Sequence, residues 1–192
     1  MVSRYVADVD ASSVLVISAT AAEATHVPAG LDVVVTGIGK TAAAAATTEA
    51  LLRRDRDGLV VLNIGTVGAL RDGLNGLYLP SSVINHDING DAIRALGYDP
   101  TDELPIAGGD GTVLASGDVF VTDPAVRARL AERAHLVDME GYGVAFACRR
   151  LGVPVRLVKH VSDAADEGAN DWPTLVEASA IALGDWLTTN VP

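Results

Sequence analysis

The stretch from Val153 to Asp166 reads VPVRLVKHVSDAAD, a strongly apolar run that ends abruptly in Ser162 and Asp163. Such a run predicts a buried strand of an α/β sheet. Ligands of open α/β sheets sit beyond the carboxyl ends of the strands, so an acid at this point is well placed for chemistry. Asp163 is therefore the first catalytic candidate. A serine and an aspartate after a strand are also common helix caps, and spacing alone leaves that alternative open.

A second carboxylate lies upstream, in the sequence Val137-Asp138-Met139-Glu140. A short apolar strand here runs into a helix and leaves Glu140 near the junction. Two carboxylates at two such strand ends suggest acid and base chemistry.

The rest of the chain alternates short β-branched runs with alanine-rich helical stretches. This alternation predicts a single α/β domain over residues 1–192, with a mixed, mostly parallel central sheet flanked by helices. Asn85 to Gly111, rich in Asp, Gly and Pro, is expected to be a mobile loop. The strands expected to be largely buried are Val14–Ile17, Val33–Val35, Leu59–Leu62, Val113–Ala115, Leu136–Val137 and Val153–Val161, and Leu77–Val83 is expected as a further strand. The expected helices are Thr41–Arg54, Met139–Arg150 and one that begins near Pro173.

Composition restricts the partners. A chain of 192 residues that is 49% hydrophobic can bury a substantial core. Its net charge of −11 argues against nucleic acid and anionic membrane surfaces and leaves a small molecule as the expected ligand. The single cysteine, Cys148, excludes an intrachain disulfide, fits a reducing cytoplasm and is expected to be buried. No apolar run is long enough to cross a bilayer, and Met1–Tyr5 lacks the apolar segment of a signal peptide.

Three glycine-containing segments are expected to form turns. Gly37 to Thr41 ends like a phosphate-binding loop, but Val34 stands where that motif needs its first glycine, so either a tight turn or a ligand-lining turn is expected. Gly65 to Gly68 would lay backbone amides and a hydroxyl against a polyol such as ribose. In Ser116 to Val121, Phe120 could stack on a flat heterocycle or pack in the core, and both alternatives stay open.

Together these residues resemble the nucleoside phosphorylase and nucleosidase superfamily and, within it, the bacterial 5′-methylthioadenosine/S-adenosylhomocysteine nucleosidases. The resemblance runs from about Val14 to the last helix and depends on the order of several motifs. These motifs are Ser18–Glu23, Thr36–Lys40, Asn63–Gly68, Asn85–Asp87, Ser116–Phe120, Asp138–Glu140 and Ser162–Asp166.

The resemblance implies hydrolysis of the N-glycosidic bond of a purine nucleoside, such as 5′-methylthioadenosine or S-adenosylhomocysteine. Asp163 would protonate N7 of the purine, with Ser162 holding it in place. Glu140 would bind the ribose hydroxyls and favour positive charge at C1′, while Met139 packs on the sugar. Glu23 would position or deprotonate the attacking water; without the family, a solvated residue at a helix start is an alternative. An oxocarbenium-like transition state independently calls for an acid on one side and negative charge on the other.

The remaining implied contacts concern the substrate and a second subunit. Thr66, with Gly65, and Lys159 would lie near the water, in places where relatives carry a serine and an arginine. Phe120 would stack on the base and the Val121 backbone would contact its edge. In relatives a neighbouring subunit closes the pocket, so a homodimer is expected. The residues similar to those that close it are Leu96 and Pro105, in the loop expected over Asn85–Gly111, and this loop and the helix Met139–Arg150 are expected at the dimer contact.

No cofactor or metal is expected. His86, Asp87 and His160 do not have the spacing of metal ligands, and His160 is expected to be a hydrogen-bonded core histidine. Asn63 stands where phosphorylase relatives carry an arginine, so water is the expected nucleophile rather than phosphate.

Departures from the family keep alternatives open. Only thirteen residues separate Glu23 from Gly37, so a strand pair that flanks the pocket in relatives is expected to be missing. Futalosine is therefore an alternative substrate. A phosphorylase and a non-catalytic nucleoside-binding protein are the alternative functions.

Overall fold

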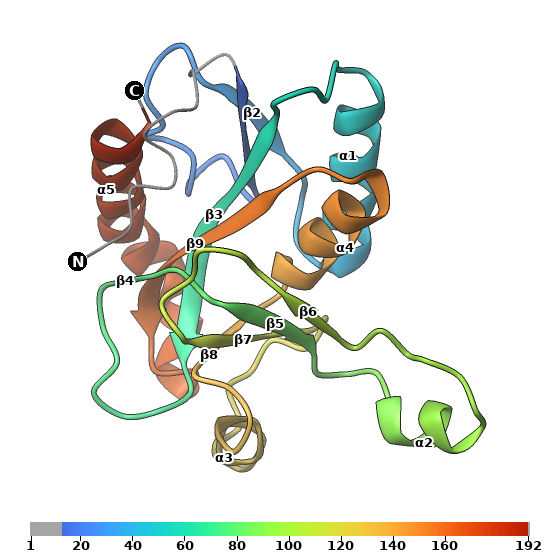
Figure 1. Cartoon of the computed structure of the whole chain (residues 1–192). Helices are drawn as coiled ribbons and strands as arrows, with labels where there is room; N and C mark the ends of the chain where they lie inside the picture. Colours follow the sequence, from blue (N-terminus) through green and yellow to red (C-terminus); the bar gives the residue numbers. More distant parts are fainter. Residues whose placement is uncertain (1–12, 192) are drawn as a thin grey trace.

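The computed structural model describes residues 13–191, and its central feature is a nine-stranded sheet with helices on its faces (Figure 1). Residues 1–12, which include Met1–Tyr5, and Pro192 lie outside the described residues, so both ends of the expected domain do as well. The elements are β1 (Val14–Ser18), β2 (Asp32–Val35), α1 (Lys40–Leu52), β3 (Val60–Ala69), β4 (Leu77–Tyr78), β5 (Ser82–Asn85), α2 (Gly90–Ala95), β6 (Glu103–Pro105), β7 (Val113–Ser116), α3 (Pro124–Ala131), β8 (Leu136–Asp138), α4 (Gly141–Leu151), β9 (Val155–Asp163), the 3-10 helix η2 (Glu167–Asp171) and α5 (Trp172–Asn190).

The sheet is mixed and mostly parallel, as predicted. Its strand order is β2-β1-β3-β8-β7-β5-β6, and β9 adds to it through β3 and β4. Within the described residues, five strand pairings are parallel and three are antiparallel. β3 is the hub, because it pairs with β1 over its first half, with β9 along most of its length and with β8 at its end.

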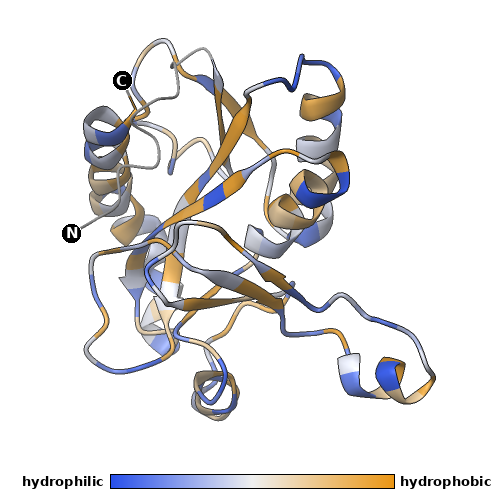
Figure 2. Cartoon of the chain, viewed as in Figure 1, coloured by the Kyte–Doolittle hydropathy of each residue, from blue (hydrophilic) through white to orange (hydrophobic). Residues whose placement is uncertain are grey.

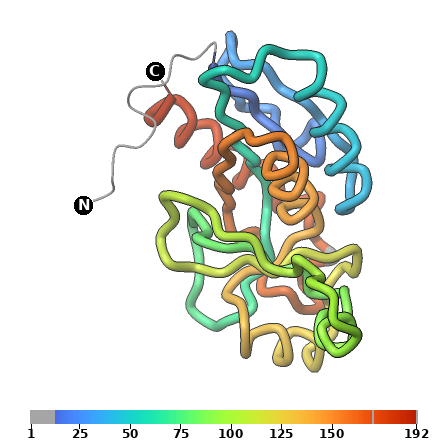
Figure 3. The backbone as a smooth tube through the Cα atoms, turned by 45° about the vertical axis from the view of Figure 1, so that its right-hand side comes forward, coloured from blue at the N-terminus to red at the C-terminus, as the bar shows by residue number. Residues whose placement is uncertain are grey.

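Both faces of the central strands are covered. In β1, Leu15 and Ile17 pack in a core with α1 and α4, whereas Val14 and Val16 point the other way, into a core with α5. Figures 1 and 3 show these helices on opposite sides of the sheet, and the strands between them are among the most hydrophobic parts of the ribbon in Figure 2. Cys148 of α4 is fully buried in the first core, as predicted.

The prediction that β2 is largely buried is wrong. This strand pairs with β1 alone among the described strands and ends the sheet, so side chains such as Val33 and Val35 are exposed. The described segment between Glu23 and Gly37 contains only this one strand, in line with the expected loss of a strand pair.

Three further expectations about the middle of the chain are wrong. Gly65–Gly68 is not a turn, because β3 continues through it to Ala69. Leu77–Val83 is not one strand, because β4 pairs with β9 and β5 pairs with β6 and β7. Asn85–Gly111 is not a structureless loop, because it contains α2 and β6, and it extends from the body of the molecule as an arm (Figures 1 and 3).

The predicted helices form with shifted ends. α1 ends at Leu52, two residues before the expected end at Arg54. α4 ends at Leu151, one residue after the expected end at Arg150, and the residue that follows it, Gly152, has a left-handed φ of 70° that suits a glycine. α5 begins at Trp172, one residue before Pro173. Among the described helices, none has the length and apolar character needed to cross a membrane.

Candidate active site

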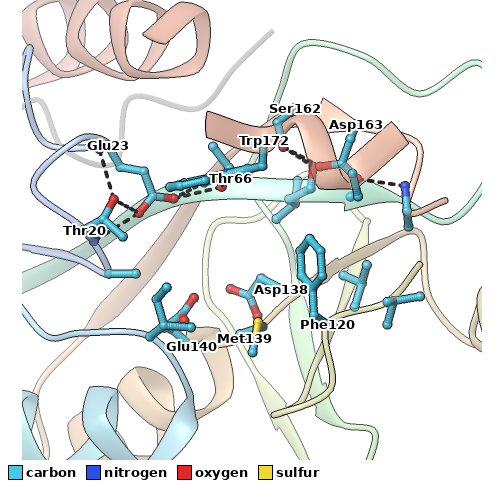
Figure 4. Close-up of a pocket in the computed structure, with 18 of the residues that line it drawn as sticks. Thr20, Glu23, Thr66, Phe120, Asp138, Met139, Glu140, Ser162, Asp163 and Trp172 are labelled. Carbon is cyan, nitrogen blue, oxygen red and sulfur yellow. Dashed lines mark hydrogen bonds between the residues drawn. The ribbon is translucent and has the colours of Figure 1, made fainter. Parts of the chain in front are cut away.

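A cavity of about 330 Å³ opens at the carboxyl ends of β1, β7, β8 and β9, beside the second half of β3 (Figure 4). This volume lies at the lower end of the range for small-molecule sites. Four carboxylates line it, together with apolar side chains. The lining residues are Ala19, Thr20, Glu23, Ile38, Thr66, Val67, Gly68, Val119, Phe120, Val121, Val137, Asp138, Met139, Glu140, Ser162, Asp163, Ala165, Ala169, Trp172 and Pro173.

A β-bulge directs Asp163 toward the cavity. The β3–β9 register pairs Val67 with Val161 and then Gly68 with Asp163, so Ser162 is left unpaired in the ladder. The Ser162 hydroxyl donates to Asp163 Oδ2 at 2.7 Å, and the Ala165 N–H donates to Oδ1 at 2.8 Å. These bonds fix the carboxyl group. Asp163 lies inside β9, and η2 has Asp166 as its side-chain cap, so the helix-cap alternative for Asp163 is wrong.

Glu23 is a buried carboxylate, 4% exposed, that accepts hydrogen bonds at both oxygens. Thr66 donates to Oε1 through its N–H at 2.8 Å and its hydroxyl at 2.9 Å. Thr20 donates to Oε2 through its N–H at 3.2 Å and its hydroxyl at 2.9 Å. Residues 21–26 form turns rather than a helix, so the alternative of a solvated helix-start residue is wrong.

Glu140 lies between β8 and α4, where the sequence placed it. Its Oε1 accepts a hydrogen bond of 2.8 Å from the N–H of Gly39, a residue of the β2–α1 turn. Burial raises the pKa of Glu140 to about 7, and the nearby Asp138 carboxylate adds to the increase. The Gly39 N–H and the Lys159 ammonium oppose that shift but do not cancel it.

The β2–α1 turn is held to neighbouring loops by Lys40 and does not form a phosphate-binding loop. The Lys40 ammonium forms an ion pair with Asp87 and donates to Asn85 Oδ1 at 2.6 Å. The Lys40 N–H donates to Asp118 Oδ1 at 2.7 Å. The Lys40 ammonium thus ties this turn to the end of β5, and the Lys40 backbone N–H ties it to the loop after β7. The structure agrees with both alternatives for the turn, because Gly37 and Gly39 have left-handed φ values of 83° and 100° and Ile38 lines the cavity.

The apolar wall is formed by the loop after β7. Phe120 is 50% exposed and lines the cavity, so the core-packing alternative is wrong. Its neighbour Val121 is buried, with only a small part of its surface on the cavity. An exposed aromatic face over an open cavity can stack on a flat ring system.

Lys159 and Gly65 lie behind the lining. Lys159 is 1% exposed, and its ammonium pairs with Asp138 Oδ2 at 2.9 Å. A Cβ on Gly65 would lie 3.1 Å from Glu23 Oε1 and 3.5 Å from Lys159 Nζ, so the bare backbone lets both groups approach β3. The other residues expected in the site line the cavity together; they are Glu23, Thr66, Phe120, Val121, Met139, Glu140, Ser162 and Asp163.

Two residues of the site were missed from the sequence. Asp138 lines the cavity and neutralises Lys159, and its place in the Asp138–Glu140 motif is the signal that could have found it. Trp172 lines the cavity from the start of α5, and its indole N–H donates to Thr66 Oγ1 at 2.9 Å. No local pattern around Trp172 indicates that contact, because the two residues are far apart in sequence.

His160 has the environment that was expected for it. It lies on β9, partly buried, and its Nδ1 is 2.9 Å from the Ser179 hydroxyl of α5. Burial lowers its pKa. It does not line the cavity, and its side-chain hydrogen bond is with α5.

Comparison with known proteins adds independent information. Residues 109–183 match the family model described as the phosphorylase superfamily. The chain is 30% identical over 186 residues to a 5′-methylthioadenosine/S-adenosylhomocysteine nucleosidase of Shewanella oneidensis, covering 81% of this chain and 75% of the relative. It is also 34% identical over 117 residues to an aminodeoxyfutalosine nucleosidase of Helicobacter pylori, covering 59% of this chain and 50% of that protein.

A solved structure agrees with the fold and with these relatives. It is a Helicobacter pylori MTAN mutant with 5′-methylthioadenosine in the active site, and it superposes with a TM-score of 0.80 at 25% identity, covering 93% of this chain and 97% of that one. The sequence relative covers most of both chains, and the structural match covers nearly all of both. The chain belongs to the phosphorylase superfamily, the family that includes these nucleosidases.

Proposed function

We propose that the protein is a purine nucleosidase, which hydrolyses the N-glycosidic bond of an adenine-bearing nucleoside and releases the free base. The observation that carries this proposal is the charge of one cavity: four carboxylates line it, and no lysine, arginine or histidine does among the described residues. Such a site suits a sugar that becomes cationic.

Three acids would share the reaction. Asp163 donates its proton to N7 of the purine as the C1′–N9 bond breaks, and the electron pair of that bond leaves with the base. Glu140 in its ionised form stabilises the positive charge at C1′ and binds the ribose hydroxyls. Glu23 accepts a proton from the water whose oxygen bonds to C1′. The products are a neutral base and a free sugar.

The same geometry argues against phosphorolysis. A phosphate dianion needs cationic groups or a dense set of free amides. Lys159 is paired with Asp138, Lys40 is paired with Asp87, and the Gly39 N–H is bonded to Glu140. The groups that could have received phosphate are thus already satisfied, and the acidic lining would repel it.

The proposed substrate class is based on the side chains that line the cavity and on the substrates for which the sequence relatives are named. Phe120 offers a stacking face for the base and Met139 an apolar contact for the sugar. The residues in supporting roles around them are Val121, Ser162, Thr66, Gly65 and Lys159. The relatives are named for 5′-methylthioadenosine, S-adenosylhomocysteine and aminodeoxyfutalosine, and we infer a substrate from this group. The single strand between Glu23 and Gly37 favours testing the bulkier futalosine as well.

We further propose a homodimer that works in the cytoplasm. The arm that contains α2 exposes Leu96, which is 75% exposed, and Tyr98, and an exposed apolar arm of this kind suits a second copy of the chain. On α4, Phe146 stacks on Tyr142 with ring centroids 5.9 Å apart and remains partly exposed. A free, buried thiol at Cys148 suits a reducing compartment.

Incubation with five nucleosides tests the function. Purified protein is mixed with 5′-methylthioadenosine, S-adenosylhomocysteine, futalosine, adenosine or inosine, with and without phosphate, and the products are separated. A free ribose sugar supports hydrolysis. A ribose 1-phosphate product would instead establish a phosphorylase, and unchanged substrate with measurable binding would establish a non-catalytic nucleoside-binding protein.

A further inference from the structure

Two tryptophans lie on α5, and they have different surroundings. Trp172, at the first residue of the helix, lines the cavity and donates its indole N–H to Thr66 Oγ1 at 2.9 Å. Trp186 packs against the apolar core between α5 and the sheet and does not line the cavity. Only the first of them touches the acidic site (Figure 4).

The contact of Trp172 sets the direction of the Thr66 hydroxyl. An indole N–H can only donate, and a hydroxyl has one proton and two lone pairs. Because Thr66 Oγ1 accepts from Trp172, its own proton is free to point at Glu23 Oε1, which lies 2.9 Å away. The three groups therefore form a directed chain from the indole through the hydroxyl to the carboxylate.

The position of the Glu23 carboxylate depends on a small set of hydrogen-bond donors. Glu23 also receives the Thr66 N–H and both donors of Thr20, so the position of the whole carboxylate depends on two threonines. Thr20 lies two residues after the end of β1, whereas the Thr66 hydroxyl is fixed from outside its own strand, by Trp172 of α5. Loss of the indole N–H would leave that hydroxyl free to rotate away from Glu23.

We propose that Trp172 is a positioning residue for the reaction, which holds the Glu23 carboxylate in place through the hydroxyl of Thr66. This inference rests on the proposed function, in which Glu23 receives a proton from the attacking water. The indole ring also forms part of the cavity wall, so the positioning role must be separated from simple packing. Trp172→Phe makes that separation, because it keeps an aromatic ring and removes the N–H group.

Kinetics with 5′-methylthioadenosine test the proposal. Trp172→Phe is expected to lower kcat about fivefold to tenfold while KM stays within about twofold, since one hydrogen bond that orients the base is lost and the wall remains. Trp186→Phe, on the same helix, is the matched control and should keep both constants. In a Thr66→Val background, Trp172→Phe should add little further loss, because the group through which it acts is already absent.

A measurement without turnover tests the contact itself. The exchange of the Trp172 indole proton with solvent, followed by NMR and assigned with Trp186→Phe, should be slow in the wild type and at least several times faster in Thr66→Val. Any one of three results would overturn the positioning role. Trp172→Phe could be as active as Trp186→Phe, or the losses of kcat in Trp172→Phe and Thr66→Val could multiply fully in the double variant. The third such result is an indole exchange rate that is the same in Thr66→Val as in the wild type. Wild-type protein that cleaves none of the five nucleosides would overturn the proposed function, and the exchange rates would then still decide whether Trp172 orients Thr66.

Discussion

Asp163 is held by one hydroxyl and one backbone N–H, and both of these contacts can be kept while its proton is removed. In Asp163→Asn, the amide oxygen can still accept from Ala165 and the amide N–H₂ can donate to Ser162. We therefore expect kcat to fall by a factor of about 10²–10⁴, the usual contribution of a general acid, with substrate affinity nearly unchanged. Steady-state kinetics and calorimetric binding measure the two effects.

The neighbouring Asp166 provides a matched control for that substitution. It does not line the cavity, and its Oδ1 caps η2 by accepting from the Gly168 N–H, a role that asparagine also fills. Asp166→Asn should retain the wild-type rate. Near-normal turnover in Asp163→Asn would remove Asp163 from the role of acid.

Glu140 links activity to stability through its pKa. Because burial raises that pKa from 4.5 to about 7, the folded protein holds a proton on Glu140 at pH values where the unfolded chain has released it. This contribution to stability is fully present below pH 4.5 and is lost as the pH rises through 7. Glu140→Gln cannot ionise, so we expect it to be more stable than the wild type at pH 8, by up to about 3 kcal/mol, and much less active.

Urea unfolding at pH 5 and pH 8 measures the Glu140 effect. The stability of Glu140→Gln should fall less between these two pH values than that of the wild type, while Glu132→Gln, an exposed residue after α3, should follow the wild type. Equal pH dependence in Glu140→Gln and the wild type would show that Glu140 titrates normally. The rate of the reaction should depend on pH in the opposite direction to stability. The reaction needs the ionised form of Glu140, so kcat should decrease as the pH falls below about 7.

At the scale of the element, β3 needs glycine where the site is most crowded. A Cβ on Gly68 would lie 2.8 Å from the Ala165 Cβ and 3.0 Å from Asp163 Oδ1. Gly68→Ala should therefore push the β9 bulge outward, lowering the free energy of unfolding by about 1–3 kcal/mol and lowering kcat more than an equally destabilising core change would.

A second substitution isolates the cause of the Gly68→Ala effect. Ala165 has a left-handed φ of 52°, so Ala165→Gly fits the backbone there and removes one of the two clashing groups. The double variant should recover part of the stability lost by Gly68→Ala, and less of the rate, because Asp163 remains crowded. Thermal unfolding and kcat measure both; a double variant no more stable than Gly68→Ala would contradict the clash with Ala165.

The same strand shows why the sequence predicted some elements and missed others. β1, β7 and β8 could be predicted because short apolar runs with β-branched residues favour strands over helices, and α4 could be predicted because Gly152 follows its last residue. The second half of β3 was read as a turn, since glycines in a sequence normally mark chain reversals. Here they instead make room for Glu23, Lys159 and Asp163, and those contacts come from distant parts of the chain.

The candidate site was predictable only in part, for a related reason. Asp163 and Glu140 could be found at strand ends, because an acid there stands out against apolar neighbours. That Glu23 would meet them came from the family resemblance, because no local pattern determines which strand ends lie together. The Asp138–Lys159 pair and the Trp172–Thr66 contact join residues 21 or more positions apart, and pairings of this kind appear only with the fold.

At the scale of the whole molecule, the arm that contains α2 is ordered by contacts at its base and exposes apolar groups near its tip. The Tyr142 hydroxyl donates to the Thr101 carbonyl, and Arg94 forms an ion pair with Asp102, so the arm has a fixed direction. Leu96 stands on it with 75% of its surface exposed. A standard protein interface buries about 800 Å² on each partner. The arm projects from the body of the molecule, where a second copy of the chain can reach it (Figure 1).

Leu96→Asp is expected to convert the proposed dimer to monomers, because it places a charge on the apolar surface through which we propose that the two copies meet. If the partner's arm closes the cavity, kcat/KM should fall at least tenfold with it. Leu52→Asp, which changes another exposed leucine at the end of α1, is the matched control and should remain dimeric and active. Sedimentation velocity combined with kinetics at the same protein concentration measures both effects. A wild-type protein that sediments as a fully active monomer would contradict the dimer, and a fully active Leu96→Asp monomer would show that one chain closes its own cavity.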